Sequence, residues 1–184
     1  MKKTALVIID IINDMEFDGG ERLLEQSRPI VKPIQKLKKQ ARELDLPVIY
    51  VNDNFGLWQE DKDELIEHCL KGRGSEIANQ LRPEDDEFFI IKPKHSGFYG
   101  TQLDILLRQL EVQNLVLTGV AGDICILFTA NDAYMRDYNL WVPKDCMASE
   151  VESDNDAALQ IIKRSTFSNI KPTSDVTIKD AFST

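Results

Sequence analysis

The stretch Leu115-Val116-Leu117-Thr118-Gly119-Val120-Ala121-Gly122-Asp123-Ile124-Cys125 decides how this chain folds. Its first four residues form an apolar run typical of a buried strand, and the small residues after them indicate a tight turn. A helical pattern then begins, with Cys125 in or near its first turn. A helix N-terminus stabilises negative charge and can lower the pKa of a thiol, so Cys125 is a candidate nucleophile. A structural cysteine is the alternative.

The same alternation of strand and helix runs along the whole chain. We expect strands at 4–10, 48–51, 88–91, 115–118 and 140–142, with a short one near 169–171. We expect helices at 30–44, 64–70, after Ser75, from Thr101, at 125–136 and at 153–164. Pro29 and Pro33 suit only the entry or first turn of the first helix. The pattern predicts a single domain over residues 1–184 with a three-layer α/β/α, Rossmann-like fold and about six mainly parallel strands.

Composition excludes several classes of function. With 42% hydrophobic and 29% charged residues, the 184-residue chain resembles an ordinary globular protein. Its net charge of −9 argues against a nucleic-acid surface. No run approaches the roughly 18 apolar residues of a membrane span, and the N-terminal apolar run has no cleavage site, so we expect a cytoplasmic protein without membrane contact.

The cysteine and histidine counts bear on redox state and metal binding. The three cysteines form neither an even disulfide set nor a CxxC pair, so we expect Cys69 and Cys146 to be reduced structural thiols. Two histidines are too few for a histidine-rich metal site.

Polar and reactive groups follow several of the expected strands. They are Asp10, the run 52–54, Lys92 and the turn before Cys125. Ligands of parallel α/β folds bind beyond the carboxyl ends of the strands. This convergence on one edge of the sheet favours an enzyme with a small-molecule substrate.

Each of these groups has a chemical interpretation and a structural one. Asp10 could exchange a proton with Cys125 and a leaving group, or it could cap a loop or pair structurally with Lys92. Lys92 continues a buried strand, and its ammonium could favour the thiolate and polarise a carbonyl. We interpret Lys94 as solvated.

The sequence resembles the isochorismatase-like cysteine hydrolases, a family that includes nicotinamidases and N-carbamoylsarcosine amidase. The resemblance covers nearly the whole chain in the correct order. The matching segments are 6–14, Lys92-Pro93, 96–103, 117–125, Thr129-Ala130-Asn131-Asp132-Ala133 and Asp145-Cys146-Met147-Ala148.

The resemblance implies a catalytic triad of Asp10, Lys92 and Cys125. It also implies a cis peptide at Val120-Ala121, which would aim the amide N–H groups of Ala121 and Cys125 at a developing oxyanion. Cys125 would attack an amide-like carbonyl, Asp10 would carry the proton to the leaving amine, and water would hydrolyse the thioester. The implied activity is that of a metal-independent amidohydrolase acting on a small amide, carbamoyl or related acyl compound.

The chain departs from some relatives. Nicotinamidases of the family carry an Asp-x-His metal motif after the second strand, whereas this chain has Asp53-Asn54-Phe55 there. Asp53 alone is a poor zinc site, so we expect no bound metal and doubt nicotinamidase activity. Asp123, two residues before the nucleophile, is a less expected residue and would oppose thiolate formation if it lay close.

Several questions stay open at this level. Asn54, Phe55, Trp58, Phe98 and Tyr99 are candidate substrate-binding residues, although packing explains the aromatic ones equally well. His95 could touch substrate or lie at the surface. The first strand leads into no glycine-rich phosphate loop, so we expect no cofactor. Isochorismatase-type vinyl-ether hydrolysis and a catalytically idle binding or assembly protein are the alternative functions. Because its relatives are commonly oligomeric, we also expect a homo-oligomer.

Overall fold

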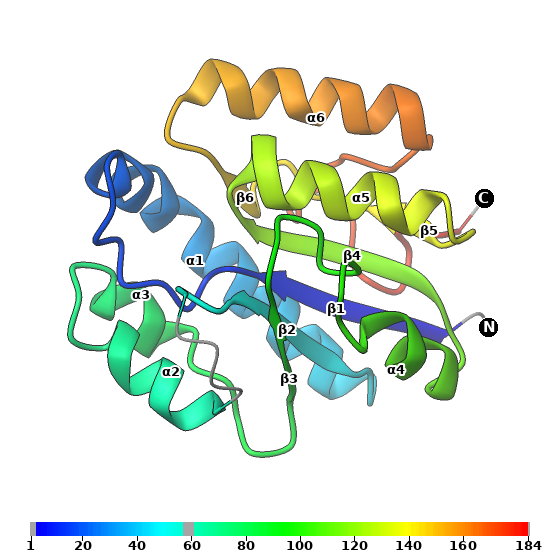
Figure 1. Cartoon of the computed structure of the whole chain (residues 1–184). Helices are drawn as coiled ribbons and strands as arrows, with labels where there is room; N and C mark the ends of the chain where they lie inside the picture. The colour runs from blue at the N-terminus through cyan, green and yellow to red at the C-terminus, as the bar shows by residue number, and fades with distance from the viewer. Residues whose placement is uncertain (1–2, 57–60, 184) are drawn as a thin grey trace.

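The computed structural model describes residues 3–56 and 61–183 of the chain. A six-stranded sheet, all of whose strand pairs are parallel, crosses the molecule (Figure 1). Its strands are β1 (Lys3–Ile9), β2 (Val48–Asp53), β3 (Phe88–Lys92), β4 (Val112–Val120), β5 (Asn139–Trp141) and β6 (Met147–Ala148). The α/β class with a parallel sheet, expected from the sequence, is confirmed.

The order of the strands places a crevice beside β1. The sheet runs β3-β2-β1-β4-β5, with β6 paired to the end of β4. The chain therefore moves outward from β1 to β3 and then returns to the other side of β1. At such a reversal the connections leave in opposite directions, and the carboxyl ends of the two strands open onto a ligand-sized crevice.

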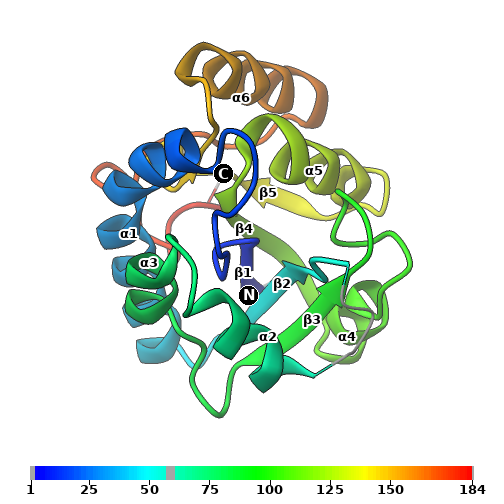
Figure 2. The same cartoon turned by 60° about the vertical axis from the view of Figure 1, so that its left-hand side comes forward.

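Helices cover both faces of the sheet (Figure 2). They are α1 (Gly20–Glu43), α2 (Lys62–Cys69), α3 (Ser75–Gln80), α4 (Leu103–Gln109), α5 (Leu127–Tyr134) and α6 (Glu152–Thr166). Alternate side chains of β1 enter two separate cores. Leu6 and Ile8 pack with α1, α2 and α3, whereas Val7 and Ile9 pack with α4, α5 and α6. Burial on both faces explains why the central strands are continuous apolar runs.

Helix α1 begins ten residues before the expected start at residue 30. Pro29 and Pro33, expected at its entry, lie inside it. Pro29 is exposed and Pro33 half-buried, so water can reach the carbonyl groups that lose their N–H partners. The buried stripe that begins at Leu23 and continues through Ile34 and Leu37 stabilises the helix through the interruption.

Two short elements were absent from the sequence-based prediction. The turn Gly122–Ile126, here called η1, contains Cys125 and is π-helical, and α5 begins only after it. Strand β6 adds a two-residue pairing at which Gly119 and Val120 of β4 oppose Met147 and Ala148. Near the C-terminus, Asn169 forms only an isolated bridge with Trp141 where a short strand was expected. Among the described helices, none is long and apolar enough to cross a membrane.

Candidate active site

Three strand ends bring Asp10, Lys92 and Cys125 together. Asp10 follows β1, Lys92 is the last residue of β3, and Cys125 lies in the turn after β4. Because β2 separates β3 from β1, the long Lys92 side chain is needed to span the gap to Asp10. All three groups thus meet at the carboxyl edge of the sheet.

The Lys92 ammonium lies at the centre of the site. Its side chain is fully buried, and its Nζ atom lies 2.8 Å from Asp10 Oδ2. The same atom donates to the Cys125 Sγ at 3.5 Å and to the carbonyl oxygen of Lys94 at 3.1 Å. A buried cation is stable when it is paired and hydrogen-bonded, and Lys92 meets both conditions.

Asp10 is held by backbone as well as by charge. Its φ of 50° turns the chain sharply out of β1 into the left-handed region. One carboxylate oxygen, Oδ1, accepts a 2.7 Å hydrogen bond from the Asp53 backbone N–H, and Oδ2 faces Lys92. With both oxygens engaged, the carboxylate has a fixed orientation between β2 and the nucleophile.

The pKa of the Cys125 thiol is raised, which is opposite to the lowering expected from its sequence position. Burial is the largest cause and the negative charge of Asp10 the next, and together they outweigh the favourable effect of Lys92. The thiol is half-buried rather than open to water. In the free protein, therefore, the Cys125 side chain is a neutral thiol, which would need a base in order to act as a nucleophile.

The two charged partners are also shifted. Burial raises the pKa of the Asp10 carboxyl despite the opposing influence of Lys92. Burial alone would lower the pKa of the Lys92 ammonium, but the combined charges of Asp10, Cys125 and Asp53 raise it. Asp10 is thus a stronger base than an exposed carboxylate, and Lys92 stays protonated.

The backbone before the nucleophile has a special geometry. The Val120–Ala121 peptide bond is cis, at the position implied by the family resemblance. Just before it, Gly119 has φ +116°, and a Cβ there would lie 2.0 Å from the Ile9 carbonyl oxygen. Only glycine permits β4 to approach β1 this closely at the point where the crevice opens.

The loop after Lys92 is fixed to α5. The Gly97 N–H donates to Thr129 Oγ1 at 2.9 Å, and Ser96 hydrogen-bonds Asp132. Thr101 Oγ1 in turn donates to the Gly97 carbonyl at 2.5 Å. Two segments that carried the family resemblance, 96–103 and 129–133, therefore contact each other and tie Lys92 to the helix that follows Cys125.

The expected substrate-binding residues have different surroundings. Asn54 is buried and accepts a hydrogen bond from the Gly56 N–H, and the Phe55 ring lies 6.1 Å from that of His68. Phe98 is in the core, 5% exposed and stacked on Tyr138, so packing describes it better than a pocket wall. Tyr99 is exposed. Trp58 lies outside the described residues.

The structure also gives the positions of His95 and Asp123, whose roles the sequence left undecided. The exposed His95 ring lies 5.5 Å from that of Phe128, one turn after Cys125. The Asp123 backbone N–H donates to Ser149 Oγ, and the Asp123 side chain is not among the causes of the Cys125 pKa shift.

Asp53 is a functional candidate that the sequence interpretation placed among the polar groups at the sheet edge and otherwise weighed only as an insufficient metal ligand. Its backbone N–H holds Asp10, and its half-exposed carboxylate lies 3.7 Å from Lys92 Nζ. It is the last residue of β2 and lies directly opposite Lys92 in the sheet register, a pairing that the sequence does not show. Among the described residues, no group of three or more histidines, cysteines or acids could hold a metal ion. The described residues therefore do not supply the ligand set that the resemblance to nicotinamidases implies.

Fold and site together define a parallel α/β protein with a carboxylate, an ammonium and a thiol in contact at the strand switch point. The isochorismatase domain model matches residues 4–173, and the chain belongs to the isochorismatase family of hydrolases.

Three relatives illustrate this similarity. The isochorismatase family protein YaaI of Bacillus subtilis (strain 168) is 47% identical, with 90% of this chain and 92% of YaaI covered. The ureidoacrylate amidohydrolase RutB of Acinetobacter baylyi is 28% identical, with 74% and 67% covered. The crystal structure of N-carbamoylsarcosine amidase from Thermoplasma acidophilum is similar with a TM-score of 0.72 at 29% identity, covering 95% of this chain and 98% of that one.

Proposed function

We propose that the protein is a metal-independent cysteine hydrolase that cleaves a small amide, carbamoyl or related acyl compound through a thioester on Cys125. The observation that carries this proposal is the single Lys92 ammonium in contact with both the Asp10 carboxylate and the Cys125 sulfur. A base, a cation and a nucleophile at hydrogen-bond range are the parts that acyl transfer requires.

The resting protonation states determine the order of proton movements. Asp10 takes the Cys125 proton as the sulfur attacks the substrate carbonyl, forming the C–S bond and an oxyanion. The oxyanion collapses, the C–N bond breaks, and Asp10 returns the proton to the departing amine or ammonia. Water then attacks the thioester while Asp10 accepts its proton. The acid leaves, and the sulfur regains its proton from Asp10.

Lys92 stays protonated throughout and compensates negative charge as it moves from Asp10 to sulfur. The amide N–H groups of Ala121 and Cys125 are our candidates for stabilising the oxyanion, as the family resemblance implies. This division of roles is consistent with the raised pKa values of all three side chains.

The names of two relatives narrow the substrate class. An amidohydrolase of ureidoacrylate and an amidase of N-carbamoylsarcosine both act on a carbon–nitrogen bond of a ureido or carbamoyl compound. We therefore infer that the substrate is a ureido or N-carbamoyl compound. Such compounds should be tested before simple amides and vinyl ethers.

The test is release of ammonia from a panel of small amides, ureido acids and N-carbamoyl compounds. We expect release by the wild-type protein, none by Cys125→Ala, and retained release by Cys69→Ala, the matched loss of a buried thiol outside the site. Trapping the thioester by mass spectrometry after acid quenching would add direct support. Release that survives Cys125→Ala would contradict the mechanism. No release from any compound would contradict the substrate class and favour vinyl-ether cleavage or an idle protein.

A further inference from the structure

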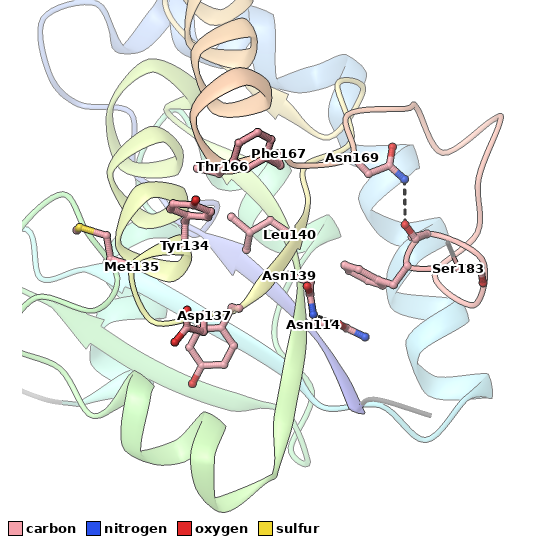
Figure 3. Close-up of a pocket in the computed structure, with 13 residues that line it drawn as sticks. Asn114, Tyr134, Met135, Asp137, Asn139, Leu140, Thr166, Phe167, Asn169 and Ser183 are labelled. Carbon is pink, nitrogen blue, oxygen red and sulfur yellow. Dashed lines mark hydrogen bonds between the residues drawn. The ribbon is translucent and has the colours of Figure 1, made fainter.

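A hollow lies at the amino ends of β4 and β5, away from Cys125. Figure 3 shows it between the end of α5, the end of α6 and the C-terminal segment, and its volume is about 830 Å³. That volume is within the range of roughly 300–1,000 Å³ that is typical of small-molecule sites. Asn114 and Asn139 line it near the beginning of β4 and β5, whereas Cys125 follows the opposite end of β4. The hollow is therefore separate from the candidate active site.

Aromatic rings line this hollow from three segments of the chain. The Tyr134 and Phe167 rings have centroids 6.2 Å apart and are tilted by 51°, so together they make an open corner. Phe182, in the C-terminal segment, also lines the hollow. That segment is held by a 3.1 Å hydrogen bond from Asn169 Nδ2 to the Ala181 carbonyl oxygen, the dashed line in Figure 3. The end of α5, the end of α6 and the C-terminal segment thus each contribute an aromatic side chain.

The two rings of the corner are open to a ligand. Phe167 is 82% exposed and Tyr134 is 42% exposed. Phe167 ends α6 with a φ of 54°, in the left-handed region that glycine usually occupies at the end of a helix. Its ring therefore lies at the surface beside the hollow, and the ring faces can contact a bound molecule.

The hollow carries a negative charge that the described residues do not neutralise. Asp137 is the only charged residue among the described residues that line it. Its carboxylate forms no ion pair or hydrogen bond with another described residue. The adjacent Arg136 is engaged elsewhere, because its guanidinium contacts Asp132 at 2.8 Å and lies over the Phe98 ring. This charge disfavours an anionic ligand and favours a cationic one.

The other polar groups of the hollow present oxygen atoms. Asn139 uses its side-chain N–H groups on the Gln113 carbonyl at 3.3 Å and on Asn114 Oδ1 at 2.9 Å, which leaves Asn139 Oδ1 to accept. The Tyr134 hydroxyl has no hydrogen-bond partner among the described residues. Aromatic faces, a carboxylate and accepting oxygens together favour a ligand that is positively charged and has an apolar surface.

We propose that this hollow binds an organic cation, whose alkylated ammonium group lies in the corner between Tyr134 and Phe167 with Asp137 as its counter-charge. The negative face of an aromatic ring attracts a cation, and several rings acting together recognise quaternary ammonium groups. The hollow is larger than such a group alone, so the ligand carries a further body in the remaining space. The proposal does not depend on the chemistry of Cys125.

The experiment is isothermal titration calorimetry of the full chain, with choline as the probe for the cationic group. The comparison ligand is the neutral isostere of choline, in which a tert-butyl group replaces the trimethylammonium group. We expect saturable binding of choline in the millimolar range. The isostere should bind at least about tenfold more weakly, because the two ligands have the same shape and differ in charge.

Two substitutions locate the bound cation. Phe167→Leu keeps an apolar side chain but removes the ring, and Asp137→Asn removes the charge at a position whose φ of 66° asparagine also adopts. We expect each substitution to weaken choline binding by about threefold or more. The matched controls are Phe88→Leu and Asp85→Asn, at and before the start of β3 on the opposite edge of the sheet, and both should bind choline like wild type. Circular dichroism establishes that each variant is folded.

Three results would overturn the proposal. One is the absence of saturable choline binding by the wild-type protein. The second is an isostere that binds as tightly as choline, because the hollow then selects apolar volume rather than charge. The third is choline binding that either Phe167→Leu or Asp137→Asn leaves unchanged, or that a control substitution weakens as much, because the cation then binds elsewhere.

Discussion

Burial determines the resting protonation states of the three candidate catalytic side chains. Cys125 lies beside a carboxylate as well as an ammonium, and the carboxylate together with burial raises the pKa of the thiol. A thiol of this kind reacts slowly with alkylating agents until a base removes its proton. The three groups must therefore be interpreted as one coupled unit, because changing one alters the protonation of the others.

Replacing Asp10 should have opposite effects on turnover and on thiol reactivity. Asp10→Asn removes the proton acceptor, so we expect kcat/KM to fall by about 10²- to 10⁴-fold. It also removes the negative charge that raises the pKa of Cys125, so the thiol should be alkylated faster by iodoacetamide at mildly alkaline pH. Mass spectrometry of the labelled peptides measures the alkylation rate of Cys125, with the buried Cys69 and Cys146 as slow internal controls. Slower labelling of Cys125 in the variant would contradict the electrostatic account.

Asp53→Asn should move the pH profile of kcat/KM. The Asp53 charge raises the pKa of both Asp10 and Lys92, so its removal lowers both. Activity needs ionised Asp10 and is lost as pH falls through that pKa, so the acid limb should move to lower pH. The alkaline limb, where Lys92 loses its proton, should move in the same direction. Asn keeps the oxygen that accepts the Phe55 N–H.

A control substitution far from the site distinguishes the local effect of the Asp53 charge on the pH profile from the effect of a changed net charge. Asp45→Asn removes one exposed carboxylate beyond the end of α1, where its φ of 53° also suits asparagine. We expect its pH profile to match wild type. A profile unchanged by Asp53→Asn would contradict an effect of the Asp53 charge on the pKa of Asp10 and Lys92.

At the scale of elements, one buried ion pair joins α1 to the segment before β3. Lys38 Nζ contacts Glu87 Oε2 at 2.8 Å and the Tyr50 hydroxyl at 2.8 Å, and both charged side chains are at most 10% exposed. The Tyr50 hydroxyl donates onward to the Leu81 carbonyl at 2.7 Å. The network thereby connects helix, sheet and loop through fully partnered polar groups.

Breaking that pair should destabilise the whole protein. Lys38→Met leaves the Glu87 carboxylate buried without its cation, which costs about 3–5 kcal/mol of unfolding free energy. Urea denaturation followed by circular dichroism measures this loss. Its neighbour Lys39 pairs with Glu43 at 3.8 Å on the surface, with side chains 79% and 61% exposed, so Lys39→Met should cost less than about 0.5 kcal/mol. Equal costs for the two substitutions would contradict the role assigned to burial.

The helices and strands that were predicted accurately are those with a strong pattern in the local sequence. Strands such as β1, predicted at 4–10 and found at Lys3–Ile9, are continuous apolar runs that a sheet covered on both faces buries. The predicted start of α1 is ten residues too late because Pro29 and Pro33 are typical of the first turn of a helix. In the structure, the packing of the buried helix face outweighs the hydrogen bonds that the two prolines remove. Strand β6 has two residues, and nothing local distinguishes it from a loop.

For the whole molecule, the absence of a metal motif gives a direct prediction. Position 55 carries phenylalanine where the resemblance to nicotinamidases implies a histidine, and Asp53 faces Lys92. We expect dialysis against a chelator to leave turnover unchanged, and elemental analysis of the purified protein to find zinc far below one ion per chain. Stoichiometric zinc, or activity lost to the chelator and restored by metal, would contradict the prediction.

The sequence by itself determined the class of fold and selected the candidate reactive residues. Hydrophobic runs and their lengths specify parallel strands, and a polar residue at the end of such a run must lie at the carboxyl edge of the sheet. Asp10, Lys92 and Cys125 could be selected in this way before any coordinates. The burial of Phe98, which is 5% exposed, could not be read from the sequence because an aromatic residue in a loop looks the same whether it faces a ligand or the core.

Tertiary structure decided the electrostatics of the site and the pairing of distant residues. The sequence placed Cys125 at a helix start and suggested a lowered pKa. Burial of the thiol and the nearby negative charge of Asp10 raise that pKa instead. The contribution of Asp53 required the register that sets it opposite Lys92. Charge interactions depend on distance and on exclusion of water, and both are fixed only when separate strands pack into one sheet.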